Sequence, residues 1–371
     1  MKKFLLIVIV FFIFFLFSGV RISAQEEIVY EPPEEEILEA RVERILEEGK
    51  TKPMGSDDFQ HFQSLELLVT KGALKDQRIV VETGDVSVAN NPLYKVNDKL
   101  VVAHSKDFEG NDSFYITDYI RRGSLTLLFI IFILVTVLIA RWRGMLSLVG
   151  MGISFLVIFY FILPKILSGY NPVGIAILGS LIIIPISFLL SHGLNKKTLI
   201  AIGGTLIALI ITGILANVFV QAAKLTGFAT EEAGFLQIAK QGAVNIKGLL
   251  LAGIIIGVLG VLDDITVSQS AIVSQLREAN ETLGFRELYK RAMRVGQDHI
   301  SSMVNTLVLV YTGAALPLLL LFVDNPHPFG EIVNYEIIAD EIVRTLVGSI
   351  GLVLAVPITT LIAALVFGRK R

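Results

Sequence analysis

Two adjacent carboxylates mark the stretch VLDDITVSQ, in which Asp263 and Asp264 follow a strongly apolar run. An ionisable residue inside a membrane span costs ~2.5 to 3.5 kcal/mol on insertion scales, so it indicates a function if it lies inside the bilayer. There the pair would change charge with proton occupancy and bias a conformational equilibrium. The structural alternative is that one carboxylate caps an amphipathic helix beginning at Ile265 by accepting backbone N–H bonds.

The depth of the aspartate pair decides between these interpretations, and the sequence leaves both open. A span that starts at Lys247 places Asp263 ~24 Å along the helix axis, closer to the cytoplasmic face than to the midplane. The next residues are semi-polar, with Thr266, Ser268 and Gln269 but no Gly or Pro. One tilted helix could therefore continue to Leu276 and carry the aspartates deeper.

A second polar group lies in the stretch GQDHISSMVNTLVLVYTGAALP. Its members are Asp298, Asn305 and Thr312 at intervals of seven, with His299, Ser302 and Thr306 on the adjacent strip. A polar stripe facing lipid stabilises a span poorly, so we expect this face to point to protein or water. The alternative for each Ser, Thr or Asn is a structural hydrogen bond to a neighbouring helix. No metal site is predicted, because His299 has no second histidine at ligand spacing.

Apolar segments long enough to cross a ~30 Å hydrocarbon layer recur from Ser124 onward. They lie near 124–140, 144–163, 172–191, 198–220, 247–267, 300–323 and 345–367. Gly253, Gly257 and Gly260 predict close helix packing in the fifth segment. Residues 277–296 form an amphipathic stretch that we expect to rest on anionic headgroups. The predicted fold class is therefore a polytopic α-helical membrane bundle of seven mature spans, covering residues 123–371.

The first third of the chain lacks the repeated apolar spans and has a different composition. Residues 1–24 have the anatomy of a signal peptide or an uncleaved signal anchor, with Lys2 and Lys3 before an apolar run. Residues 25–122 are polar and hold short β-branched runs separated by turns: Leu65 to Thr70, Arg78 to Thr83 and Lys99 to His104. We expect a small, mostly β domain of the OB-like or SH3-like kind, preceded by a flexible acidic linker from Glu26 to Glu36.

Composition and charge restrict the class of protein. The chain has 371 residues, 53% of them hydrophobic, and a mean hydropathy of +0.69, which is typical of membrane proteins. It has no cysteine, which excludes disulfides, thiolate metal sites and cysteine nucleophiles. The net charge of −2 is uninformative about a nucleic-acid partner, and we expect none because no basic domain stands out. No P-loop, nucleophile elbow, HExxH or dinucleotide motif is present, so we expect no enzyme and no cofactor.

Basic residues predict the orientation, because cytoplasmic loops hold the excess of lysine and arginine. With the N-terminus inside, the inner segments carry fourteen of these residues and the outer connections seven. The distribution predicts a multi-pass protein of a bacterial cell membrane, with the β domain outside and the C-terminus in the cytoplasm.

Five stretches of the chain are distinctive: LLLAGIIIGVLGVLDDITVSQSAIVSQLREAN, ELYKRAMRVGQDHISSMVNTLVLVYTGAALPLLLL, HGLNKKT, RWRG and EIVRTLVGSIGLVLAVPITT. Together they resemble the YibE/F family of multi-pass membrane proteins. A more distant resemblance links VLDDITV to the aspartate-bearing LNDTIVV pattern of the SecD/SecF translocase subunits and RND-type permeases. That resemblance would make Asp264 a proton-coupling residue, with Asp263, Asp298 and Asn305 in support.

Two hypotheses of function follow. The first is a secondary transporter or permease-like module for a small solute, coupled to protons through Asp263 and Asp264. The second is a non-transporting envelope scaffold or assembly factor whose β domain binds an envelope partner. Under both hypotheses the protein contacts the lipid bilayer, and the sequence leaves its oligomeric state open. An intramembrane aspartyl protease is disfavoured, because the motif contexts of those enzymes are missing.

Overall fold

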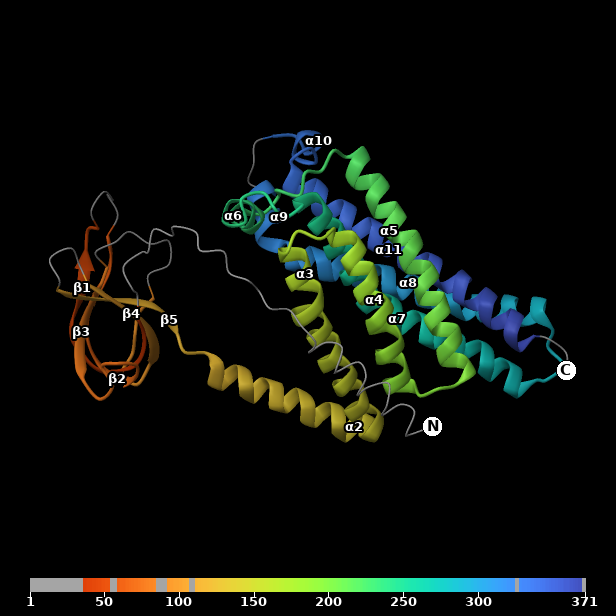
Figure 1. Ribbon diagram of the computed structural model, residues 1–371, viewed down its shortest axis with the longest axis horizontal. Helices are drawn as coiled ribbons and strands as arrows, with labels where there is room; N and C mark the ends of the chain where they lie inside the picture. Colours follow the sequence, from red (N-terminus) through yellow and green to blue (C-terminus); the bar gives the residue numbers. More distant parts are fainter. Residues whose placement is uncertain (1–35, 54–58, 85–91, 107–110, 324–326, 369–371) are drawn as a thin grey trace. The chain divides into compact units, whose positions relative to one another are not determined.

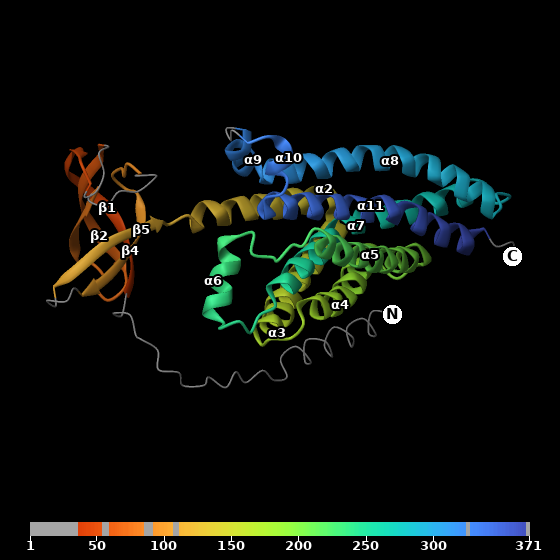
Figure 2. The same cartoon turned by 90° about the horizontal axis from the view of Figure 1, so that it is seen from above.

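The computed structural model describes residues 36–53, 59–84, 92–106, 111–323 and 327–368 (Figures 1 and 2). The chain divides into two compact units at the border between Val135 and Thr136. One unit contains a β sheet and the other a bundle of helices, and each is described by itself. The predicted signal or anchor, residues 1–24, and the linker before Glu36 lie outside the described residues.

The β unit is one antiparallel sheet of five strands in the order β3-β2-β1-β4-β5. The strands are β1 (Glu36–Thr51), β2 (Gln60–Lys71), β3 (Arg78–Thr83), β4 (Lys99–Lys106) and β5 (Asp112–Tyr119). The three predicted β-branched runs fall in β2, β3 and β4, so a small β sheet is confirmed. The two edge strands, β3 and β5, contact each other, which shows that the sheet curls around its core.

Alternating side chains build the core of this sheet. On β1, Leu38, Ala40 and Val42 are buried, while the residues between them are at least partly exposed. They pack against Leu65 and Leu67 of β2 and against the buried residues of β3 and β4. This period of two is the pattern of a strand with one buried face. Strand β1 is thus the centre of the sheet, although it begins where the sequence predicted the end of a linker.

Two leucines of β1 give a matched test of this core. Leu38 is fully buried and Leu46 is 51% exposed. In the isolated fragment 25–122, Leu38→Ala should lower the free energy of unfolding by about 2–5 kcal/mol, because it leaves a cavity. Leu46→Ala should cost less than about 1 kcal/mol. Chemical denaturation followed by circular dichroism measures both, and equal losses would contradict the assigned face.

Among the described residues, five helices are long and apolar enough to cross a membrane, or up to six if one bent pair is counted as a span. The long helices are α2 (Arg122–Val157), α4 (Pro172–His192), α5 (Lys196–Ala222), α7 (Ile246–Ala279), α8 (Phe285–Ala314) and α11 (Glu336–Phe367). Shorter elements are the π-helical turn η1 (Ile158–Ile162), α3 (Leu163–Leu167), α6 (Glu231–Ala239), α9 (Leu316–Val323) and α10 (Phe329–Ile332).

Two of the predicted span boundaries differ in the structure. The expected spans 124–140 and 144–163 belong to one helical stretch, Arg122–Leu167, with a break at Arg141 (φ 52°, ψ −136°). The expected span 300–323 is not straight, because α8 and α9 meet at an angle of 72°. Pro317 follows this bend directly, and a proline cannot donate the hydrogen bond that would continue α8.

Helix α7 is the central helix of the unit, since α4, α5, α8 and α11 all pack against it. Buried polar side chains of α7 form hydrogen bonds with three of these helices. The Thr205 hydroxyl of α5 and the Thr266 hydroxyl lie 2.7 Å apart. Gln269 donates through Nε2 to the Ala292 carbonyl of α8 at 2.9 Å and to the Thr360 hydroxyl of α11 at 2.7 Å. Thr266 and Gln269 therefore form hydrogen bonds between helices.

Close packing through glycine occurs between α5 and α11. A Cβ at Gly204 would collide with the Thr359 side chain, and a Cβ at Gly351 would collide with the Thr212 side chain. The predicted seam of Gly253, Gly257 and Gly260 is different. These three glycines are exposed, and nothing described lies within 4 Å of a Cβ built on any of them. The expectation that they pack helices together within this chain is wrong.

A pair of alanine substitutions distinguishes the two kinds of glycine. Gly351→Ala should lower the melting temperature in detergent, because the new methyl group must displace Thr212 in a packed interface. Gly257→Ala should leave the temperature unchanged or raise it, since alanine favours a helix by roughly 0.5–1 kcal/mol. The double variant Gly351→Ala, Thr212→Ala should recover part of the loss. A loss at Gly257 as large as that at Gly351 would contradict this packing.

Candidate functional site

The two aspartates lie inside an uninterrupted helix. Helix α7 runs from Ile246 to Ala279, so neither Asp263 nor Asp264 is at a helix N-terminus. The interpretation of a cap for a helix beginning at Ile265 is therefore wrong. Asp263 is half-buried and Asp264 is exposed to a cleft at one end of the bundle. Their position fits the alternative of one continuous helix.

A polar cleft of about 380 Å³ surrounds the pair. Three helical segments supply its walls: α2 after its break, the C-terminal half of α4, and α7. The lining residues are Arg143, Ser147, Ser187, Ser191, His192, Asp263, Asp264, Val267 and Ser268. The volume lies within the range of small-molecule sites in proteins. Of the predicted supporting residues of α7, only Ser268 lies in this cleft.

An apolar cavity of about 190 Å³ adjoins the cleft, because Ser187 and Asp263 line both. Its other walls include Ile158, Phe188 and Leu259, together with the exposed Gly260 of α7. Gly260 adds no side chain at this point, so the space between α2, α4 and α7 stays open. The aspartates thus stand at the border between a polar and an apolar compartment.

Opposite charges meet in the polar cleft. Two carboxylates, one guanidinium and one imidazole line it, those of Asp263, Asp264, Arg143 and His192. The Oδ1 atom of Asp263 is buried and accepts no hydrogen bond from any described residue. A buried carboxylate oxygen without a donor is costly in its charged form. It is the arrangement expected of a group that binds a proton, an ion or a substrate.

The polar residues of α8 do not reach this cleft. The buried face of α8 consists of Leu288, Ala292, Gly296 and Leu307. Asp298, Asn305 and Thr312 lie on the opposite face and are exposed, as are Ser302 and Thr306. Ser302 accepts a hydrogen bond at its backbone carbonyl from the Thr306 hydroxyl within the same helix. The expected seam between this stripe and Asp264 is therefore not formed among the described residues. His299 is half-buried, and its buried Nδ1 atom has no hydrogen-bond partner in the described part of the chain.

The amphipathic stretch 277–296 also differs from the expectation. It contains the last residues of α7, a turn and the first part of α8. Leu288 is fully buried and packs with Leu283 and with Ala364 of α11. Its apolar stripe thus contacts protein at Leu288 and Ala292, while Val295 is exposed.

Sequence reasoning missed the α2 and α4 walls of the cleft. Ser187 and Ser191 are four residues apart on α4, the spacing of one helix face, and this was a signal in an otherwise apolar segment. Arg143 and His192 belong to the stretches RWRG and HGLNKKT, which lie between expected spans. Only the fold shows that they stand beside the aspartates. Among the described residues, no three His, Asp or Glu side chains lie close enough together to hold a metal ion.

The comparison with protein families agrees with this architecture. The family described as YibE/F-like protein matches residues 128–369, which include most of α2 and every long helix from α4 to α11. The chain belongs to the YibE/F family. With its apolar helices, this membership identifies a membrane protein. Neither the curated proteins nor the solved structures give a match. The predicted resemblance to SecD/SecF is not shown.

Single cysteines can test the cleft, because the natural chain has none. Ser268 lines the cleft, whereas Ser270 is fully buried and donates to the Lys197 carbonyl. We expect Ser268→Cys to react rapidly with a hydrophilic maleimide added to both sides of membrane vesicles. Ser270→Cys should react only after denaturation. Equal labelling of the two folded variants would contradict the cleft.

Proposed function

We propose that this YibE/F protein is a secondary transporter or permease-like module for a small solute, coupled to protons through Asp263 and Asp264. The observation that carries the proposal is the cleft of about 380 Å³ in which both carboxylates stand with Arg143 and His192. Ionisable groups that face a cavity among membrane-spanning helices are typical of ion and proton pathways. We assign no enzymatic reaction to the site.

The proposed mechanism rests on like charges at adjacent positions. Two carboxylates side by side on α7 repel each other, so binding of one proton relieves both that repulsion and the cost of the unpaired Asp263 oxygen. Arg143 offers a counter-charge from α2, whose helix is broken at Arg141, two residues away. Protonation would weaken the attraction between α7 and this segment. That change gives proton occupancy a way to favour one arrangement of the helices over another.

We further propose seven mature crossings, with the break at Arg141 as a turn between the first two and the bent α8–α9 pair as one crossing. One end of the bundle holds the cleft, the start of α5 and the α7–α8 turn, since Lys197 of α5 pairs with Glu278 of α7. The basic residues of the predicted inner loops are in these segments, which supports a cytoplasmic location for this end. The β unit would then be extracytoplasmic, and its curled five-stranded sheet supports the OB-like alternative.

A pH step applied to reconstituted protein tests proton coupling without a known substrate. Proteoliposomes on a solid-supported membrane should give a transient current when protons bind. We expect the current to be lost in the double variant Asp263→Asn, Asp264→Asn, because neither amide can titrate. Asp298→Asn is the matched control, since it removes a carboxylate on the outward face of α8, and it should keep the current.

Two outcomes would contradict the proposal. One is an unchanged current in a well-folded double variant. The other is an equal loss of current in the Asp298→Asn control, which would show that the current depends on the total charge of the protein and not on the carboxylates of the cleft.

The second candidate function is an envelope scaffold that acts through the β unit. It is favoured by exposed aromatic side chains on this unit, Phe59 at 67% and Tyr115 at 60%. Exposed apolar side chains on a small domain can mark a partner surface. If fragment 25–122, tethered by an unrelated membrane span, restored the phenotype of a deletion strain, this function would replace transport. Failure of the tethered fragment together with success of the full chain favours the transporter.

A further inference from the structure

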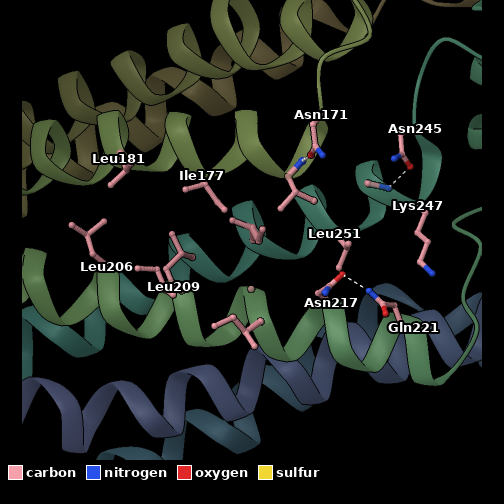
Figure 3. A pocket seen from close by; sticks show the side chains of 16 residues that line it. Asn171, Ile177, Leu181, Leu206, Leu209, Asn217, Gln221, Asn245, Lys247 and Leu251 are labelled. Atoms are coloured by element: carbon pink, nitrogen blue, oxygen red, sulfur yellow. Dashed lines mark hydrogen bonds between the residues drawn. The ribbon is translucent and has the colours of Figure 1, made fainter.

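A long groove of the helical unit lies away from the aspartates, between α4, α5 and α7 (Figure 3). It has a volume of about 740 Å³, and none of its lining residues belongs to the cleft around Asp263. Its polar end is formed by the first residues of α4 and α7 and the last turns of α5. These ends are opposite to the α4–α5 turn, so groove and cleft open toward different ends of the bundle.

Polar and apolar side chains are segregated along the groove. Figure 3 shows Asn171, Asn217, Gln221, Asn245 and Lys247 gathered at one end, with Ile177, Leu181, Leu206 and Leu209 further along. On α5 the lining runs from Leu206 to Gln221, about 22 Å at ~1.5 Å per residue. That length exceeds half of a ~30 Å hydrocarbon layer. The groove therefore has the dimensions and the polarity of one lipid leaflet.

The polar end is suited to an anion. Lys247 is the one ionisable side chain among the lining residues, and no acidic side chain lines the described groove. The Oδ1 atoms of Asn171 and Asn245 cap the N-termini of α4 and α7 by accepting backbone N–H bonds. Asn217 accepts from Gln221 at 3.0 Å. The side-chain oxygens of these asparagines thus act as acceptors within the protein. Their amide N–H groups can donate to a ligand, and these donors add to the positive charge of Lys247.

The apolar part of the groove is open on its side. Leu181, Ile210 and Ile214 line it and are 47%, 58% and 60% exposed. In a helix that crosses the bilayer, such side chains face lipid, so a molecule can enter from the membrane without crossing an aqueous mouth. Gly213 lies between these side chains, and a Cβ there would only touch Ile255 at 3.7 Å, which keeps the middle of the groove wide.

We propose that this groove binds an anionic membrane amphiphile, with its acyl chain between α4, α5 and α7 and its headgroup at Lys247. The site is distinct from the proposed proton site and does not depend on it. Charge complementarity at Lys247 and lateral opening to the bilayer select an anionic lipid over a soluble anion, because a soluble anion would leave the long apolar wall unused.

Photo-crosslinking in nanodiscs tests the proposal on the full-length protein. The probes are phosphatidylglycerol and phosphatidylcholine, each with a diazirine on the acyl chain, used separately at equal mole fraction. We expect phosphatidylglycerol to label residues of the α4, α5 and α7 segments that line the groove. Lys247→Gln should reduce this label by about fivefold, which corresponds to the ~1 kcal/mol that one lysine contributes near an anionic lipid. The phosphatidylcholine label should change little.

Matched variants separate a specific effect from misfolding. Gly213→Leu places a side chain in the groove and should abolish labelling there by both lipids. Gly203→Leu is on the same helix, has open space around its Cβ and does not line the groove, so it should label like the natural protein. Lys240→Gln removes a charge outside the groove and should also have no effect.

Four results would overturn the proposal. Label spread evenly over all lipid-facing helices, or unchanged by Gly213→Leu in a protein that is still folded, would show no specific site. Label that appears only after residues 1–24 are replaced by a cleavable signal would make that segment the occupant. Crosslinks to a second copy of the chain would make the groove a dimer interface. None of these assays requires transport, so their outcome is independent of the test on Asp263 and Asp264.

Discussion

The need to satisfy polar side chains on a central membrane helix governs the structure of the helical unit. Helix α7 is packed by four other helices, yet it carries a dense polar sequence in its second half. In a low-dielectric interior each of these groups must find a partner or reach water. Thr266 and Gln269 find partners on α5, α8 and α11. Asp263 and Asp264 are directed to the side where α2 and α4 leave a cleft.

The different partners that these two kinds of polar group need explain the position of the cleft. Hydroxyl and amide groups satisfy each other across helix contacts at low cost, so the tightly packed side of α7 takes them. Carboxylates need water or a counter-charge, and the side of α7 that faces α2 and α4 supplies both a cleft and Arg143. The exposed glycines of α7 also affect the packing on this side of the helix. With nothing within 4 Å of a Cβ at Gly257 or Gly260, they keep this side of the helix open instead of closing it.

The sequence predicted the helical class, the family and three of the five strands, because these depend on local composition and periodicity. It missed β1, whose ten-residue core EILEARVERI is rich in helix-forming residues. There, long-range pairing with β2 and β4 overrides local propensity. A helix face was also assigned correctly on α8, but periodicity shows which residues share a face and not what that face meets. For the same reason Asp298 and Asn305 were grouped with Asp264, and Arg143 and His192 were not.

Proton binding at the α7 aspartates is a proposal that infrared difference spectroscopy of the reconstituted protein between two pH values can measure. We expect a carboxylic-acid band that shifts when the buffer is changed to D2O. This band should disappear when Asp263 and Asp264 are both replaced by asparagine and remain when Asp298 is replaced. A difference spectrum without such a band, or one in which the band survives the double replacement, would contradict the account.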